Sequence, residues 1–522
     1  MTRINNPRAR VCVPVCARRA SELPAAIERA ARAADVIELR LDCLADDAQL
    51  DAALAQLPSV LRARTRPFIL TFRPAEQGGH RQLDAATRLD FWTRRLRPLI
   101  DDAATRPDFV DLELDLVSDA RRRDELLRVF DSATLIISRH DFAGVPADFG
   151  RIYDDAMSVP RAIPKLAARA ADATDCLPLF HLLERARREG REMIAVAMGE
   201  AGLATRVLAP SRGAFLTYGS LGDEHATAPG QIAASDLREL YRIDSLGART
   251  TITGLVGSPV SHSLSPHIHN AAFAARGLDA VYIPFEVRDA RAFARRMAHP
   301  LTRELDWNLR GFSVTAPHKG AIIDSLDRVE ESAREIGAVN TVVAEGAELR
   351  GYNTDAPASL APLDGLIDLE GARVAVLGAG GAARALRGSL RAAGARASVY
   401  ARDASISRPV ADTFGADSQT LSGARFAGFD AVVNATPLGT RGARENETAA
   451  SAEQLRGVRV AYDLVYNPSE TRFMREARAA GCASVVGGLQ MLVAQAAAQF
   501  ELWTGEPAPV EVMRTAAQGA LR

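Results

Sequence analysis

The chain has 522 residues, too many for one hydrophobic core, and at roughly 150 residues per domain this length suggests about three domains. Hydrophobic residues make up 47% and charged residues 25%, the balance of a globular protein. The net charge of −1 gives no electrostatic reason to expect nucleic acid or a membrane surface as a partner. No apolar signal region follows the opening MTRINNPRAR, and no run reaches the ~18 apolar residues of a membrane helix, so we expect a cytoplasmic protein.

The five cysteines are scattered along the chain and odd in number. Cys12 and Cys16 are too far apart for a Cys-x-x-Cys redox pair, and no His/Cys ligand spacing surrounds them. We therefore expect buried free thiols in a reducing compartment, and no metal site. The five are Cys12, Cys16, Cys43, Cys176 and Cys482.

Short apolar runs recur through the first half of the chain, each followed by an amphipathic or Ala-rich segment. Each run has the length and composition of a β-strand, and the intervening segments have helical spacing. Strands that alternate with helices predict a parallel sheet, and eight such units in about 240 residues predict a (β/α)8 TIM barrel. The runs begin at Val11, Val36, Pro67, Phe109, Thr134, Ala162, Glu192 and Gly213.

Charged residues lie in these runs or at their ends, where the chemistry of a TIM barrel gathers. A lysine such as Lys165, desolvated in an apolar run near arginines, would have a lowered pKa and could act as an amine nucleophile. His140 could be a general acid or base, and Arg206 could bind a carboxylate. Taken singly, each is more commonly a solvated, capping or structural residue. Their occurrence on successive predicted strands indicates a site.

The runs VIELRLD, LTFRPAEQGG, VDLELD, ISRHDF, PKLA, MGEAG and ATAPGQ, in this order over residues 11–242, resemble type I 3-dehydroquinate dehydratase. The resemblance implies an imine between Lys165 and the substrate ketone, proton transfer by His140, and orientation of His140 by Glu113. Two residues depart from the family pattern: Gln77 replaces a usual glutamate, and Thr227 a usual serine. The implied substrate contacts are Glu38, Arg40, Arg73, Arg206, Thr227 and Gln231.

The second half contains a dinucleotide-binding fingerprint. In RVAVLGAGGAARALRGSL, an apolar strand runs into Gly378-x-Gly380-x-x-Ala383 and then a helix. The glycines let the backbone approach a pyrophosphate at the helix amino terminus. The next strand ends in Arg402 and Asp403, which would favour the 2′-phosphate of NADP and the ribose hydroxyl of NAD, respectively. On the residues alone, both cofactors stay open.

Four polar clusters precede this fingerprint: SPVSHSLSPHIHN, GFSVTAPHKG, GAVNT and GYNTD. From about Gly254 onward the sequence resembles shikimate dehydrogenase, which implies catalytic roles for Lys319 and Asp355. Retention of Arg402 favours NADP, although Asp403 could repel a 2′-phosphate. The implied substrate contacts are Ser263, Ser265, Thr315, Asn340 and Gln495, and the implied cofactor contacts are Gly378, Gly380, Gly381, Ala382, Arg402, Thr436, Gly488 and Met491.

The two resemblances together imply an α/β chain of three parts: a dehydratase barrel over 1–245, a substrate-binding domain over 249–356 completed by 487–522, and a Rossmann domain over 357–486. The implied function is dehydration of 3-dehydroquinate to 3-dehydroshikimate, followed by reduction to shikimate with NADPH. The alternatives are an NAD-dependent catabolic quinate or shikimate dehydrogenase fusion and a non-catalytic regulator that binds these metabolites. We expect either a monomer or a homodimer.

Overall fold

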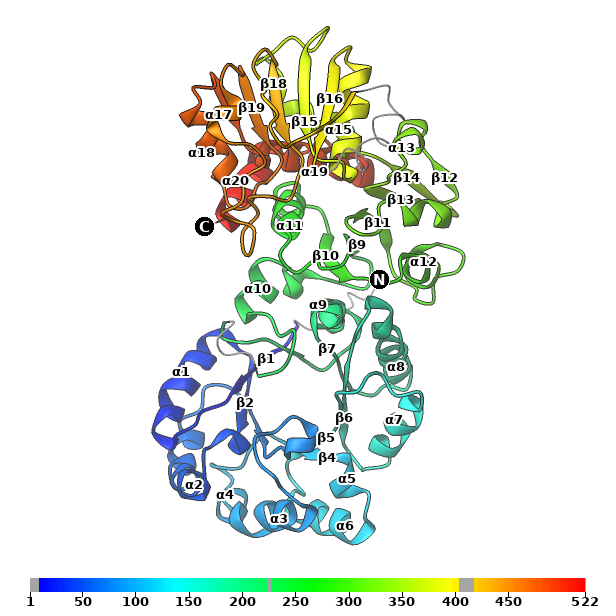
Figure 1. Cartoon of the computed structure of the whole chain (residues 1–522). Helices are drawn as coiled ribbons and strands as arrows, with labels where there is room; N and C mark the ends of the chain where they lie inside the picture. The colour runs from blue at the N-terminus through cyan, green and yellow to red at the C-terminus, as the bar shows by residue number, and fades with distance from the viewer. Residues whose placement is uncertain (1–8, 223–226, 403–416, 522) are drawn as a thin grey trace. The chain divides into compact units, whose positions relative to one another are not determined.

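The computed structural model describes residues 9–222, 227–402 and 417–521 (Figure 1). The chain divides into two compact units. The first contains Met1–Thr250, Ile283–Met297 and Glu304–Asn308, and the second contains Thr251–Tyr282, Ala298–Arg303 and Leu309–Arg522. Over the described ranges, no helix is both long and apolar enough to cross a membrane.

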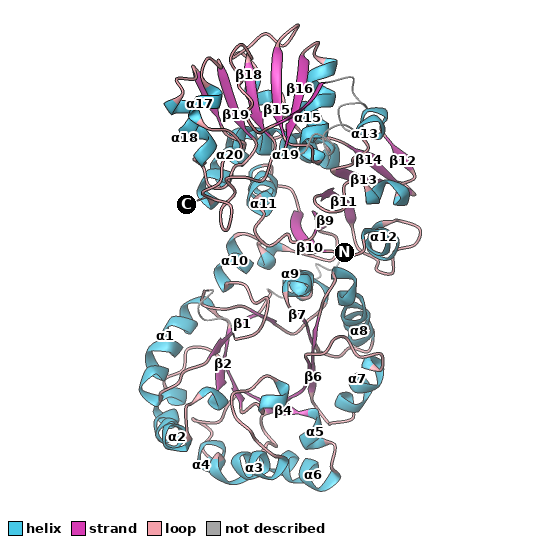
Figure 2. Ribbon diagram, in the orientation of Figure 1, coloured by secondary structure: helices cyan, strands magenta, loops and turns pink. Residues whose placement is uncertain are grey.

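The first unit contains an eight-stranded parallel sheet, and its order β7-β6-β5-β4-β3-β2-β1-β8 runs around a barrel (Figure 2). An isolated bridge between Met193 and Ala214 nearly closes the ring beside β7 and β8. All eight predicted strands are present, so the predicted (β/α)8 fold is confirmed. The strands are β1 (Val11–Val15), β2 (Val36–Arg40), β3 (Phe68–Thr71), β4 (Phe109–Glu113), β5 (Thr134–Asp141), β6 (Ile163–Arg169), β7 (Ile194–Met198) and β8 (Thr217–Tyr218).

Helices surround the barrel strands (Figure 2). Strands β1, β2 and β7 are buried along their whole length, because one face of each points into the barrel and the other toward the helices. The helices are α1 (Leu23–Ala33), α2 (Asp47–Arg62), α3 (Ala85–Asp90), α4 (Arg97–Asp101), α5 (Leu114–Val117), α6 (Ala120–Val129), α7 (Phe149–Met157), α8 (Leu177–Arg188), α9 (Leu203–Leu208) and α10 (Ala234–Glu239).

After the barrel, the chain forms a mixed sheet with the order β10-β9-β11-β13-β14-β12. Strand β11 pairs with β9 in parallel and with β13 antiparallel. Strands β13 and β14 pair antiparallel and form a short hairpin. Its strands are β9 (Thr251–Gly257), β10 (Ala280–Glu286), β11 (Leu309–Val314), β12 (Arg328–Val329), β13 (Thr341–Glu345) and β14 (Glu348–Tyr352). The helices of this region are α11 (Ser265–Ala275), α12 (Ala290–Phe293), α13 (Glu331–Ile336) and α14 (Asp355–Ala358).

A second, wholly parallel sheet has the order β17-β16-β15-β18-β19-β20. The direction of the strand order reverses between β15 and β18, the switch point where doubly wound sheets bind nucleotides. This arrangement confirms the predicted Rossmann-type fold. The strands are β15 (Arg373–Leu377), β16 (Arg396–Ala401), β17 (Asp417–Thr420), β18 (Ala431–Asn434), β19 (Val460–Asp463) and β20 (Ser484–Val486), and the helices α15 (Gly381–Ala392), α17 (Ala452–Leu455) and α18 (Arg472–Ala479).

The last two helices, α19 (Leu489–Thr504) and α20 (Val510–Ala520), return to the mixed sheet. Phe500 and Trp503 of α19 and Met513 of α20 share one buried core with Ile268 and Phe273 of α11. Two segments more than 200 residues apart in sequence therefore build one hydrophobic core.

The prediction of free thiols was wrong for one pair of cysteines. Cys16 and Cys43 form a disulfide, with Cα atoms 5.3 Å apart. Because β1 and β2 are neighbouring parallel strands, the residues that follow them meet at the same edge of the barrel. The prediction of free thiols holds for Cys12 and Cys176, which are buried, and for Cys482, which is partly buried.

Candidate active sites

The carboxy-terminal ends of the barrel strands surround a cavity of about 270 Å³, here called the barrel pocket. Strand β2 contributes Glu38 and Arg40, β5 contributes His140, and β6 contributes Lys165. The structure brings together eight of the predicted residues: Glu38, Arg40, Arg73, His140, Lys165, Arg206, Thr227 and Gln231.

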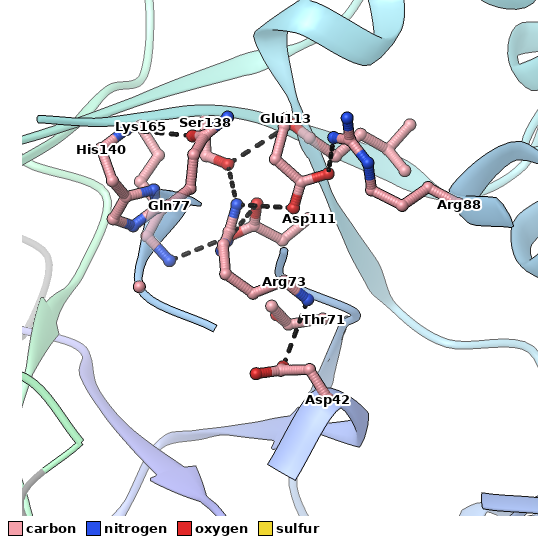
Figure 3. A network of polar contacts seen from close by, with 12 residues as sticks. Asp42, Thr71, Arg73, Gln77, Arg88, Asp111, Glu113, Ser138, His140 and Lys165 are labelled. Atoms are coloured by element: carbon pink, nitrogen blue, oxygen red, sulfur yellow. Dashed lines mark hydrogen bonds and ion pairs between the residues drawn. The ribbon is translucent and has the colours of Figure 1, made fainter. Parts of the chain in front are cut away.

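Lys165 is buried, its nearest charged partners are two carboxylates, and one of these, Asp111, is shared with Arg73. The Nζ of Lys165 lies 2.8 Å from Oδ2 of Asp111 (Figure 3). It also lies 3.3 Å from Oε1 of Glu38 and 4.4 Å from the centre of the Tyr218 ring. The other oxygen of Asp111 lies 2.8 Å from Nη2 of Arg73. Burial opposes ionisation of Asp111, but Arg73 and Lys165 outweigh it and hold the pKa of this carboxyl well below its usual range.

Glu113 does not contact His140, contrary to our expectation. Its two carboxylate oxygens accept hydrogen bonds from Arg73 and Arg88, each at 2.8 Å. Both arginines are buried, so each guanidinium requires a carboxylate partner in this region of low dielectric constant. Glu113 therefore positions Arg73, which lines the barrel pocket, and is not itself among the residues that line it.

The imidazole of His140 has one nitrogen without a partner among the described residues and a lowered pKa. Its Nδ1 has no hydrogen-bond partner among the described residues. Burial, together with the positive charges of Arg73 and Lys165, lowers the pKa of His140 well below 6.5, so the ring is neutral at pH 7. Gln77 accepts a hydrogen bond from the His140 backbone N–H at 3.2 Å (Figure 3). The amide of Gln77 donates to Asp115 at 3.1 Å.

Arg206 carries a buried positive charge that suits an anion. Only 2% of the residue is exposed, and burial lowers the pKa of the guanidinium to about 10. Its Nη2 donates to the carbonyl of Pro229 at 3.1 Å, while its Nε has no hydrogen-bond partner among the described residues. A carboxylate in the barrel pocket would provide the missing acceptor. Nearby, Thr227 donates to the side-chain oxygen of Gln231 through its backbone N–H at 2.8 Å.

The second unit contains a cavity of about 370 Å³, here called the Lys319 pocket. Nζ of Lys319 lies 2.5 Å from Oδ2 of Asp355 at the start of α14, so the carboxylate fixes the ammonium group. Asn340 is fixed in turn, because its side-chain oxygen accepts from the Thr354 backbone N–H at 2.7 Å. The predicted residues that line this pocket are Ser263, Ser265, Thr315, Lys319, Asn340, Asp355, Ala382, Gly488, Met491 and Gln495.

The turn between β15 and α15 fits a dinucleotide. Gly378 has φ +119°, and a Cβ there would lie 2.9 Å from the carbonyl oxygen of Ala435, so a side chain is excluded. A Cβ on Gly380 or Gly381 would meet no atom within 4 Å, which leaves open space at the amino terminus of α15 for a pyrophosphate. Thr436 is held beside this turn by donating to Asn434 at 2.6 Å.

Arg402 does not line the Lys319 pocket. It is exposed at the end of β16 and lines a separate cavity of about 550 Å³ together with Arg425. In a doubly wound sheet, the end of this strand lies near the adenosine ribose of the cofactor. Asp403, whose charge opposes a 2′-phosphate, lies outside the described residues.

Three protein-family models match the chain in sequence order: type I 3-dehydroquinase at residues 11–248, the shikimate dehydrogenase substrate binding domain at 255–342, and the shikimate 5′-dehydrogenase C-terminal domain at 488–518. The chloroplastic bifunctional 3-dehydroquinate dehydratase/shikimate dehydrogenase of Arabidopsis thaliana is 32% identical over 536 residues, which cover 98% of this chain and 84% of the relative. The chain belongs to the family of bifunctional 3-dehydroquinate dehydratase/shikimate dehydrogenases.

Other relatives match one or both halves of this bifunctional family. The NADP(+) shikimate dehydrogenase of Moorella thermoacetica is 43% identical over 281 residues, 51% of this chain and 92% of the relative. A solved structure of dehydroquinate dehydratase and shikimate dehydrogenase from S. pombe covers 98% of both chains at 26% identity, with a TM-score of 0.42.

Sequence reasoning missed several residues that line the two pockets of this bifunctional chain. Asp111 contacts Lys165 without lining the barrel pocket and was given no role, although it precedes Glu113 by two residues and so shares its face of β4. Tyr218 is a buried aromatic on the short strand β8, and its hydroxyl has no partner among the described residues. Other missed lining residues include His80 in the barrel pocket and Ser313, Tyr466 and Gln499 in the Lys319 pocket.

Proposed function

We propose that this chain dehydrates 3-dehydroquinate to 3-dehydroshikimate in the barrel pocket and reduces that product to shikimate with NADPH in the Lys319 pocket. The observation that carries the proposal is a lysine with a carboxylate neighbour in each pocket: Lys165 with Asp111, and Lys319 with Asp355. Membership of the bifunctional family supports both reactions and their order.

In the first reaction, we assign Lys165 as the nucleophile. Its amine adds to the substrate ketone and, after loss of water, forms an iminium that accepts electrons from the neighbouring carbon. His140 is neutral and removes the proton from that carbon. The hydroxyl on the next carbon then leaves as water, protonated by His140. Water finally hydrolyses the imine, which breaks the C–N bond, frees the product and restores the amine of Lys165. Arg206 binds the substrate carboxylate through its free guanidinium donor.

In the second reaction, we assign Lys319 as the group that stabilises and protonates the carbonyl oxygen as it becomes an alkoxide. Asp355 keeps the ammonium group oriented at 2.5 Å. Ser263, Ser265 and Gln495 line the same pocket and can hydrogen-bond the ring carboxylate and hydroxyls. NADPH supplies the hydride when it is bound, and the Gly378 turn with the α15 amino terminus would hold its pyrophosphate.

The experiment follows enone absorbance after adding 3-dehydroquinate, and then NADPH oxidation. Lys165→Met should abolish enone formation but retain NADPH oxidation with supplied 3-dehydroshikimate, and Lys319→Met should do the reverse. Borohydride added during turnover should reduce the imine and leave a covalent adduct on Lys165, detectable by mass spectrometry. Absence of both activities in folded protein would support the metabolite-binding regulator, and faster use of NADH would support the catabolic alternative.

We further propose the domain boundaries, the cellular location and the oligomeric state of the chain. We place the dehydratase in 1–245, the substrate-binding domain in 249–356 with 487–522, and the Rossmann domain in 357–486. The core shared by Phe273 and Phe500 supports the assignment of the carboxy-terminal helices to the substrate-binding domain. A cytoplasmic location and a monomeric or homodimeric state complete the proposal. Cell fractionation and light scattering, respectively, would test them.

A further inference from the structure

The Cys16–Cys43 disulfide joins an exposed cysteine to a buried one. Cys16 follows β1 directly and is exposed, whereas Cys43 ends the short 3-10 turn Leu41–Cys43 after β2 and is only 1% exposed. A thiolate arriving from solvent therefore reaches the sulfur of Cys16 and not that of Cys43.

Cys16 lies in a cavity that adjoins the barrel pocket. This second cavity, of about 480 Å³, is lined by Cys16, Glu22 and Arg29 and shares His80 and Thr227 with the barrel pocket. Nε2 of His80 lies 3.8 Å from the sulfur of Cys16, and the two sulfurs and this nitrogen all lie within 4.8 Å of one another. The imidazole of His80 therefore contacts the sulfur of Cys16 directly and lies close to that of Cys43.

Cys43 follows Asp42, which hydrogen-bonds two arginines of the barrel pocket. Its neighbour Asp42 is fully buried, and both of its oxygens accept hydrogen bonds from Arg40, at 2.9 and 2.8 Å. Asp42 also accepts from the backbone N–H of Arg73 at 3.2 Å and of His80 at 3.3 Å. The disulfide thus ties the turn that carries Asp42 to the end of β1.

We propose that Cys16–Cys43 is a site of thiol–disulfide exchange whose opening weakens substrate binding in the barrel pocket; the proposal rests on the dehydratase function assigned above. One thiolate of a dithiol attacks the sulfur of Cys16, the S–S bond breaks, and Cys43 leaves with the electron pair and takes a proton from water. The second thiol of the dithiol then displaces Cys16. The protein gains two electrons, and the dithiol becomes a disulfide.

The expected effect falls mainly on KM. With the bond open, the turn is no longer held to β1, so Asp42 holds Arg40 and Arg73 less firmly. We expect KM for 3-dehydroquinate to rise at least about fivefold, with a smaller change in kcat. The dehydrogenase activity of the same chain serves as an internal reference and should not change.

The test compares the oxidised enzyme with enzyme opened by dithiothreitol in the presence of EDTA, which removes metal that thiols could bind. Alkylation and mass spectrometry report whether the bond has opened in the folded protein. Cys16→Ser should show the raised KM under both conditions, whereas the control Cys482→Ser, which alters a cysteine outside the disulfide, should keep the wild-type response.

Two results would overturn the proposal: a bond that resists the dithiol in folded protein, or equal KM values for the open and closed wild-type enzyme. The wild-type comparison decides the question even if Cys16→Ser does not fold. Absence of dehydratase activity in both states would instead count against the proposed function, while alkylation would still show whether the site exchanges.

Discussion

The amine of Lys165 and the carboxylate of Asp111 lie 2.8 Å apart, and both side chains are buried. The other oxygen of Asp111 is 2.8 Å from Nη2 of Arg73. One carboxylate therefore holds both the proposed nucleophile and an arginine of the barrel pocket. Because Asp111 acts through Lys165, we assign it as a positioning residue.

Asp111→Asn keeps the size of the side chain but removes the charge that balances Lys165 and Arg73. Breaking a buried ion pair costs about 3 kcal/mol, so we expect dehydratase kcat/KM to fall ~10²-fold. The matched control is Asp124→Asn, an exposed acid on α6, which should behave as wild type. Equal kcat/KM values for Asp111→Asn and wild type would remove Asp111 from the mechanism. NADPH oxidation with supplied 3-dehydroshikimate should be unchanged.

Arg206→Lys should raise KM for 3-dehydroquinate more than it lowers kcat. The guanidinium can present two parallel N–H donors to a carboxylate, and an ammonium group cannot. Loss of one charge-assisted hydrogen bond, worth about 1.5–3 kcal/mol, corresponds to a rise of at least ~10-fold in KM. The control is the exposed Arg188→Lys on α8. If only kcat fell, Arg206 would have a role other than binding the carboxylate.

The dehydratase reaction should retain its rate at mildly acidic pH. His140 must be neutral to accept a proton, and its pKa lies well below 6.5, so protonation begins only below that value. We expect kcat/KM for enone formation to stay level as pH falls from 8 through 6.5 and to decline only at lower pH. An acid limb centred at 6.5 or above would show that His140 is not the base.

Gln77→Glu should move that acid limb to higher pH. The side chain of Gln77 contacts the backbone of His140, so a carboxylate there would stabilise the protonated imidazole. We expect a shift of about one pH unit in the midpoint. The matched variant Gln77→Met, which adds no charge, should leave the midpoint in place. A midpoint that does not move in Gln77→Glu would contradict this electrostatic account.

His269 should make the second unit sensitive to acid. Burial lowers the pKa of its imidazole to about 3, whereas the unfolded chain binds that proton near pH 6.5. Between these values the unfolded state holds more protons, so the free energy of unfolding falls as pH drops below 6.5, by up to ~1.4 kcal/mol per pH unit. His269→Phe, which keeps a flat ring against Tyr282, should reduce this dependence in urea unfolding measured from pH 7 to 4. The exposed His262→Gln should retain it.

The sequence predicted those site residues that could be placed by the pattern of a single strand. Lys165 lies within one apolar run and His140 directly follows the apolar part of another, and a parallel barrel brings neighbouring strands into one ring. Which charged side chains pair with one another depends on the geometry of side chains on different strands. The spacing of residues along the sequence does not give this geometry. Glu113 was therefore assigned to His140, although two buried arginines bind it. The Cys16–Cys43 bond was hidden for the same reason, since 27 residues separate the two cysteines.

The shared core of α11, α19 and α20 also sets an order of events during synthesis of the chain. The barrel strands are complete at Tyr218, and the Rossmann strands at Val486. Phe273 of α11, by contrast, packs against Phe500 in a core that also contains Met513. The ribosome must therefore release the chain as far as Met513 before this core can close, long after it has released the barrel strands. The Lys319 pocket, whose wall includes Gln495, depends on the same late segment.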